Sequence, residues 1–145
     1  MSQLPDKINL EVITPERLLV KEEVDEVVVP GSLGYLGILP GHRPFLSTLG
    51  LGELIYRQGQ ERHYLSVFGG YVEVLADRVL VLADIGEKAK EIDRERAIEA
   101  QKRAEEDLKR AKKGELSEEE IENALIRLRK ALIRLQVIDK SRSKT

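Results

Sequence analysis

The side chains best suited to catalysis or metal binding are few and scattered in this chain. His42 and His63 are the only histidines, one in a Pro-Gly turn and one in a strand pattern, so they form no metal-binding pair on a helix. The chain has no cysteine, which excludes a thiolate nucleophile and a cysteine metal site. Gly31, Gly34 and Gly37 recur at steps of three, but no Lys-Ser or Lys-Thr follows them to complete a phosphate-binding loop. We therefore expect no catalytic residue, no metal site and no required cofactor.

The distribution of charge carries a stronger signal. The net charge of −2 divides into −5 over residues 1–86, −3 over residues 87–124 and +6 over residues 125–145. A basic end of this kind favours an acidic partner, such as nucleic acid, phosphate, anionic lipid or an acidic protein surface. Because the basic end has no aromatic side chain on which bases would stack, we expect no nucleic-acid partner.

The chain changes character at Ile92-Asp93, which predicts two parts. All five prolines, all six aromatic residues and ten of the eleven glycines precede this point. Short apolar runs alternate there with turn signals, which predicts an antiparallel β-sandwich or barrel of roughly eight to ten strands over residues 1–86. The expected strands include residues 8–12, 24–29, 64–68, 71–75 and 79–82.

Residues 87–145 are predicted to form an antiparallel α-helical hairpin. Asp93 suits the N-cap of the first helix, and Lys113-Gly114 suits its end, where glycine accepts a left-handed backbone. Ser117 and Glu120 have the spacing of a capping box at the start of the second helix. Alanines dominate the inward stripe of the first helix and recur in that of the second, which permits a close approach of the two. These alanines are Ala97, Ala100, Ala104, Ala111, Ala124 and Ala131.

Neither a membrane span nor a signal peptide is expected. No stretch approaches the roughly 18 consecutive apolar residues that a transmembrane helix needs. The segment Met1–Asp6 lacks the basic flank and apolar core of a secretory signal.

Four motifs resemble one protein family. They are Gly34-Tyr35-Leu36-Gly37-Ile38-Leu39-Pro40-Gly41-His42-Arg43-Pro44-Phe45-Leu46, Phe68-Gly69-Gly70-Tyr71-Val72-Glu73-Val74, Val81-Leu82-Ala83-Asp84 and Ile92-Asp93-Arg94-Glu95-Arg96-Ala97. In this order and spacing they closely resemble the epsilon subunit of F-type ATP synthases, and the resemblance covers residues 7–138.

The resemblance implies a non-catalytic rotor subunit that couples proton flow to ATP synthesis. Residues 1–86 would attach to the gamma subunit and the membrane c-ring, and residues 87–145 would regulate. The hairpin of this family either folds against the sandwich or extends into the catalytic head, where it contacts the catalytic subunits and suppresses ATP hydrolysis. Membrane association would come only through the complex, at the cytoplasmic face of a bacterial inner membrane.

Rotor contacts are expected in the glycine- and proline-bounded loop from Gly31 to Pro44. Its apolar side chains exceed what a bare turn needs, although some of them must also serve the sandwich core. The candidate contact residues are Ser32, Tyr35, Leu36 and His42.

The resemblance also implies ATP as a regulatory ligand of the folded hairpin. The matching positions are Glu87, Ile92, Asp93, Arg96, Ala97, Arg103, Lys130 and Arg134, with Lys130 standing where the family has arginine. Arg96 and Arg103 are seven residues apart and share a helix face, as do Lys130 and Arg134 at a spacing of four. Four cations on facing helices would clamp a triphosphate, while Asp93 and Glu87 would accept from the adenine amine or a ribose hydroxyl.

For the extended hairpin, the sequence predicts an inhibitory face. Arg127, Lys130 and Arg134 recur at steps of three and four on the second helix and exceed what helix capping requires. An acidic surface of the catalytic subunits is the target that the resemblance implies. The alternative reading is a stand-alone ATP-sensing module whose hairpin opens when nucleotide is lost.

Overall fold

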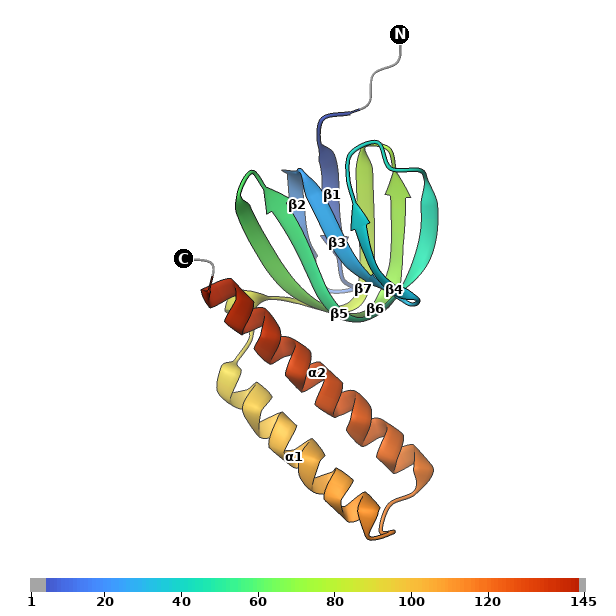
Figure 1. The fold of residues 1–145 in the computed structure, drawn as a ribbon, viewed down its shortest axis with the longest axis vertical. Helices are drawn as coiled ribbons and strands as arrows, with labels where there is room; N and C mark the ends of the chain where they lie inside the picture. Colours follow the sequence, from blue (N-terminus) through green and yellow to red (C-terminus); the bar gives the residue numbers. More distant parts are fainter. Residues whose placement is uncertain (1–4, 144–145) are drawn as a thin grey trace.

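A computed structural model describes residues 5–143 of the chain. Met1–Leu4, in the segment expected to carry no signal, and Lys144-Thr145, in the basic end, lie outside the described residues. The structure confirms the predicted class, a sheet domain followed by a helical hairpin (Figure 1). The strands are β1 (Ile8–Ile13), β2 (Leu18–Val24), β3 (Glu26–Gly31), β4 (Gly34–Ile38), β5 (Phe45–Gln58), β6 (Glu61–Leu75) and β7 (Arg78–Lys88). A 3₁₀ turn η1 (Ala89–Glu91) leads into α1 (Arg94–Lys112) and α2 (Glu118–Arg142).

The strands form one sheet in the order β2-β1-β7-β6-β5-β3-β4. Its pairs are antiparallel except β1 with β7, which is parallel and departs from the all-antiparallel expectation. The sheet curls so that its two halves face each other, and β2 also contacts β5 across the curl (Figure 1). Branched apolar side chains fill the space between the halves, among them Leu10, Val12, Val27, Leu54 and Val81.

The described residues contain seven strands, so the expectation of eight to ten was wrong. The reason is that the two strands expected at 64–68 and 71–75 are one strand, β6. Its core-facing residues shift from Leu65 and Val67 to Val72 and Val74, which changes parity across Gly69-Gly70. Both glycines have positive φ, 78° and 121°, so the strand bends there without ending.

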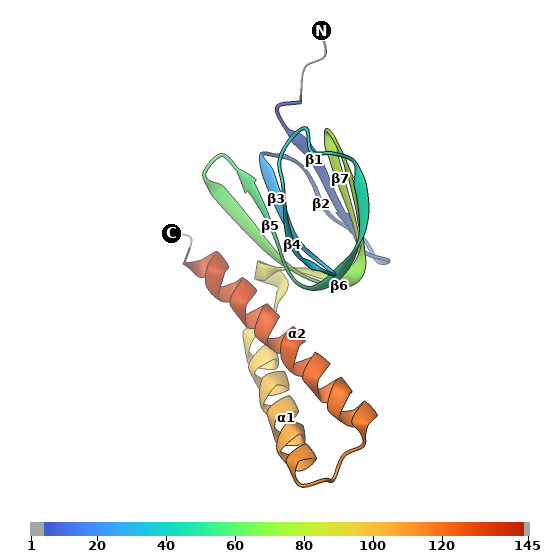
Figure 2. The same cartoon turned by 45° about the vertical axis from the view of Figure 1, so that its right-hand side comes forward.

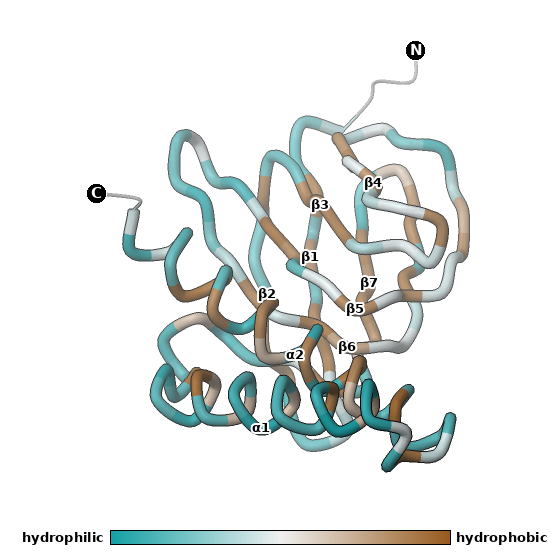
Figure 3. Tube along the Cα trace, turned by 60° about the horizontal axis from the view of Figure 1, so that its bottom comes forward, coloured by the Kyte–Doolittle hydropathy of each residue, from teal (hydrophilic) through white to brown (hydrophobic). Residues whose placement is uncertain are grey.

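The local signals for the hairpin are confirmed. The carboxylate of Asp93 accepts from the backbone N–H of Arg96 at 3.1 Å, and Gly114 ends α1 with φ 76°. Ser117 and Glu120 form both hydrogen bonds of a capping box. α1 and α2 pack along a seam whose buried members include Ala97, Ala104, Ala124 and Ala131. Hydrophilic residues dominate the rest of α1 (Figure 3).

The hairpin projects from one end of the sandwich, and α2 makes the contact between them (Figure 2). α2 packs on β5, β6 and η1. Phe68 of β6 is 3% exposed although it does not belong to the sandwich core, because α2 covers it. Neither helix of the described residues is long and apolar enough to span a membrane.

The bend in β6 generates a prediction. A Cβ at Gly70 would overlap the carbonyl oxygen of Leu82, whereas Gly34, with φ 132°, has open space around it. We expect Gly34→Ala to cost about 1–3 kcal/mol of unfolding free energy, from backbone strain alone. Gly70→Ala adds a backbone clash and should cost clearly more. Denaturant unfolding of both variants measures the difference, and equal costs would show that β6 relaxes around the clash.

Candidate functional site

Two adjoining hollows lie along the hairpin next to the sandwich. The larger, of about 840 Å³, lies where η1 leads into α1. Its lining is Glu87, Glu91, Ile92, Asp93, Glu95, Arg96, Ala97, Glu99, Ala100, Arg103 and Arg134. The smaller, of about 190 Å³, is lined by Ala100, Arg103, Arg127, Lys130 and Arg134. Ala100, Arg103 and Arg134 line both, which makes the hollows one continuous groove.

All eight candidate ATP residues line this groove, seven in the larger hollow and Lys130 in the smaller one. The inhibitory candidates Arg127, Lys130 and Arg134 all line the smaller hollow. The antiparallel packing of α1 and α2 therefore brings together side chains that lie far apart in sequence. Whether the groove binds ATP is not decided by this arrangement and stays a prediction.

The two hollows differ in charge. Every charged residue lining the smaller hollow is a cation. The larger one mixes three arginines with the carboxylates of Glu87, Glu91, Asp93, Glu95 and Glu99. An anionic ligand group is therefore favoured in the smaller hollow and a hydrogen-bond-donating group in the larger one.

Three of the candidate arginines already have acidic partners. Arg103 donates to Glu99 at 2.7 Å, and Arg127 donates to Asp107 at 2.7 Å. Arg134 donates to Glu87 at 2.8 Å and lies 4.9 Å from the centroid of the Phe68 ring. Lys130 lies over the same ring at 5.6 Å. A bound phosphate would therefore either compete with these carboxylates or use the remaining N–H donors of Arg103 and Arg134.

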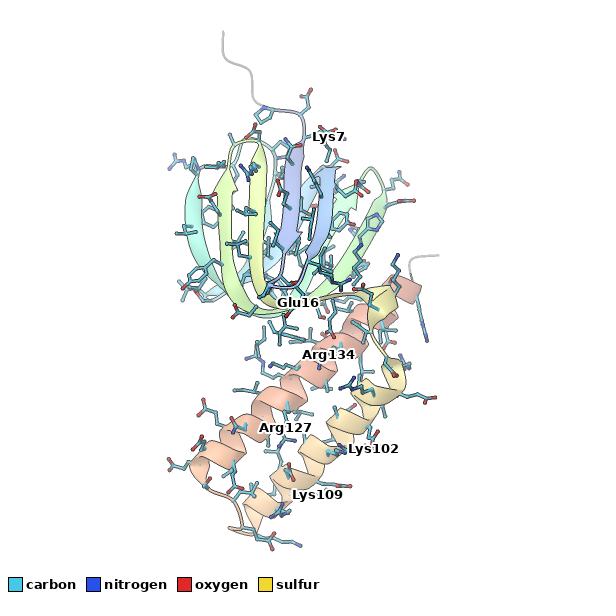
Figure 4. All side chains as sticks on the ribbon, turned by 180° about the vertical axis from the view of Figure 1, so that it is seen from behind. Lys7, Glu16, Lys102, Lys109, Arg127 and Arg134 are labelled. Atoms are coloured by element: carbon cyan, nitrogen blue, oxygen red, sulfur yellow. The ribbon has the colours of Figure 1, made fainter. Side chains whose placement is uncertain are left out.

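Two candidate residues also have structural roles. Asp93 caps α1, so one of its oxygens is already engaged with the N–H of Arg96. Ala97 is buried in the helix seam, and its side chain offers a ligand nothing but an apolar surface. Figure 4 shows Arg134 on the stretch of α2 beside the sandwich and Arg127 farther along the helix.

Sequence reasoning missed the residue pair that ties η1 to the sandwich. Arg17, in the turn after β1, donates to both oxygens of Glu91 in η1, at 2.6 and 2.8 Å. Glu91 also accepts from the N–H of Lys88 at 3.0 Å. The Arg17 guanidinium lowers the pKa of Glu91 to about 2. No local pattern could have indicated this pair, because its members are 74 residues apart.

The rotor-contact candidates do not form a uniform exposed face. Ser32 and Tyr35 are exposed, and the Tyr35 hydroxyl accepts from the N–H of Glu53 at 3.1 Å. Leu36 packs against the sandwich core. His42 is half-buried and contacts Phe45 at a ring distance of 5.2 Å.

A second apolar surface, on the outer face of β5 to β7, was not singled out from the sequence. Leu46 is 70% exposed and Tyr71 is 55% exposed, and Tyr71 lies directly opposite the exposed Leu82 in the sheet register. The sequence did carry a signal for this surface, because these apolar residues interrupt the alternation of apolar and polar side chains along their strands. Among residues 5–143 we find no group of three acidic or histidine side chains arranged to hold a metal ion.

Comparisons with known proteins agree with this architecture. Residues 7–89 match the family described as the ATP synthase Delta/Epsilon chain beta-sandwich domain, and residues 90–139 match its long alpha-helix domain. The chain is 45% identical over 134 residues to an ATP synthase epsilon chain of Syntrophotalea carbinolica, covering 92% of this chain and 95% of the relative. It is 46% identical over 136 residues to that of Dehalococcoides mccartyi, covering 94% and 95%.

A solved structure has the same fold. It is a chain of the Euglena gracilis mitochondrial ATP synthase, in a structure of its OSCP, F1 and c-ring, with a TM-score of 0.68 and 21% identity. The match covers 98% of this chain and 83% of that chain.

The Arg17–Glu91 pair predicts a pH dependence. Because the pKa of Glu91 falls from its ordinary 4.5 to about 2 on folding, the pair stabilises the folded chain fully above about pH 4.5. That contribution is lost as the pH falls from about 4.5 to 2. We expect Glu91→Gln to lower the unfolding free energy at pH 7 and to approach the wild type near pH 2. Denaturant titrations across this range test the trend, with Glu95→Gln as control, and a constant difference would contradict it.

Proposed function

Because the chain belongs to the ATP synthase epsilon-chain family, we propose that it is a non-catalytic subunit of the rotating central stalk. In this proposal the sandwich attaches to the gamma subunit and the c-ring, and the hairpin regulates ATP hydrolysis. The subunit is peripheral, at the cytoplasmic face of a bacterial inner membrane. The observation that carries the proposal is that both parts of the chain match the family in order, together spanning residues 7–139.

Attachment through the sandwich is supported by the apolar surfaces outside its core. Leu46, Tyr71 and Leu82 on β5 to β7, with Tyr35 on β4, are large apolar side chains exposed outside the sandwich core. Exposed apolar patches of this kind are typical of interaction surfaces. The Euglena gracilis assembly that contains a chain of this fold also contains a c-ring.

Within the proposal, ATP binds the groove of the folded hairpin with its phosphates in the smaller hollow. Arg103, Lys130 and Arg134 supply cations there, while Glu87 and Asp93 remain to accept from the ribose or the adenine amine. Residues from α1, α2 and β7 line the groove together. A ligand held by all three elements stabilises the folded hairpin, because it binds the folded form better than any open form.

Inhibition is proposed to require release of the hairpin from the sandwich. Once released, the basic side of α2 is free to contact an acidic surface of the catalytic subunits and to oppose rotation in the hydrolysis direction. The sandwich core lies entirely before α1, so the sandwich does not need the hairpin to complete its core. The hairpin contacts the sandwich mainly through α2, on β5, β6 and η1, which supports a movable arm.

The first prediction from this function concerns ATP affinity. Arg103→Ala removes a cation shared by both hollows, while its own ion pair with Glu99 is exposed and worth little to the fold. We expect the Kd for ATP to rise roughly ten- to a hundredfold, the cost of one charged hydrogen bond. Calorimetric titration with ATP and Mg²⁺ measures it. Lys109→Ala, on α1 but outside the groove, is the control, and equal Kd values for all three proteins would eliminate the site.

The second prediction concerns the arm. A chain ending after Glu91 keeps the whole sandwich core and the Arg17 anchor, so we expect it to assemble normally. ATP hydrolysis by the assembled complex should rise severalfold, because the inhibitory helix is gone. Arg127→Ala should release inhibition in part, because it removes one cation from the basic side of α2. Arg127 pairs with Asp107 inside the hairpin, so the change leaves the described contacts between α2 and the sandwich in place. Unchanged hydrolysis by the truncated complex at low ATP would show that the arm does not inhibit.

A further inference from the structure

Three polar residues form a line across the outer face of the sheet beneath α2. Glu53 of β5 lies directly opposite Ser66 of β6, and Ser66 lies directly opposite Glu87 of β7. Ser66 donates to Glu87 at 2.9 Å. Because paired residues of neighbouring strands point to the same face, both carboxylates face the helix that covers this part of the sheet.

α2 presents one cation to each carboxylate. Arg134 contacts Glu87, and the Nζ of Lys140 donates to Oε2 of Glu53 at 2.7 Å. Val137 is fully buried between these two cations, and it shares a helix face with Arg134 and Lys130, both of which contact the sandwich. The two ion pairs therefore bracket the apolar contact that α2 makes with the sheet.

The two partners of the second pair are buried to very different degrees. The side chain of Glu53 is 5% exposed, whereas that of Lys140 is 50% exposed. The other oxygen of Glu53, Oε1, has no hydrogen-bond partner among the described residues. A carboxylate this buried depends on the cation paired with it, because a charge removed from water is costly when it is unpaired.

We propose that the Glu53–Lys140 ion pair is a latch that holds the C-terminal half of α2 on the sandwich. Lys140 lies outside both hollows of the groove, so the ion pair forms whether or not a ligand occupies the groove. When α2 lifts, Glu53 regains water and Lys140 loses little, since it is already half in solvent. The docked hairpin therefore depends on Lys140 much more than on the charge of Glu53. This inference rests on the proposed regulation only for its consequence in the complex, since the latch itself is testable in the isolated chain.

The test uses the absence of native cysteine. Val137→Cys places a thiol that a labelling reagent reaches only when α2 lifts from the sheet, so the labelling rate follows the open fraction. Lys140→Gln in this background should raise the rate roughly ten- to a hundredfold, the equivalent of a lost charged hydrogen bond. Glu53→Gln should raise it much less, because the uncharged amide tolerates burial and its oxygen still accepts from Lys140. The double change, Glu53→Gln with Lys140→Gln, should label more slowly than Lys140→Gln alone.

Two controls separate the latch from a general loss of stability. Lys109→Gln, on the exposed side of α1, should leave the rate unchanged. Val67→Cys, used in place of Val137→Cys, puts the thiol inside the sandwich core, where it should stay slow to label in every variant. The proposal is overturned if Lys140→Gln labels no faster than Lys109→Gln, or if the double change labels as fast as Lys140→Gln alone. It is also overturned if the Val67 thiol accelerates together with the Val137 thiol. If Lys140→Gln raises the labelling rate as expected but the chain binds no ATP, the latch proposal stands and only the proposed ATP site is rejected.

Discussion

The packing of α2 on the outer face of β5 and β6 is the contact on which the rest of this architecture depends. It buries Phe68 and Val137, which the sandwich core and the helix seam do not bury on their own. It also places Arg134 beside Glu87 and thereby closes the groove between the hairpin and the sheet. Without this contact, Arg134 would leave Glu87, whereas the packing of α1 on α2 would remain.

The ion pairs between α2 and the sheet mainly fix where the helix docks, and they contribute less to the stability of the docked state. A small apolar patch tolerates sliding, whereas Glu53 and Glu87 each accept a hydrogen bond from one particular cation of α2. The partly exposed Arg134–Glu87 pair is weakened by solvent screening, so its main effect is to fix the register. Burial makes the Glu53 pair different, because its carboxylate is destabilised whenever its cation is absent.

The segment that joins the two parts of the chain is held by the sandwich at one end. Arg17 binds Glu91 through both carboxylate oxygens, which ties η1 to the sandwich, and Ile92-Asp93 is the first segment after this anchor. Asp93 then caps α1 from within the hairpin. A boundary with an anchor before it and a cap after it allows two rigid bodies to change their mutual orientation while each keeps its own hydrogen bonds. This arrangement suits the movable arm proposed for this member of the ATP synthase epsilon-chain family.

The sequence by itself determined what depends on residues close together in the chain. Asp93, Ser117 with Glu120, and Gly114 were all identified correctly, because a helix cap joins groups within a few residues of one another. The alanine seam followed from helical periodicity, and the candidate groove residues followed from motif resemblance. Only the tertiary structure decided that β6 is one bent strand, that β1 and β7 run parallel, and that Arg17 meets Glu91 and Glu53 meets Lys140. The last three of these features join residues as many as 87 positions apart, and they exist only because the curl of the sheet and the packing of α2 bring them together.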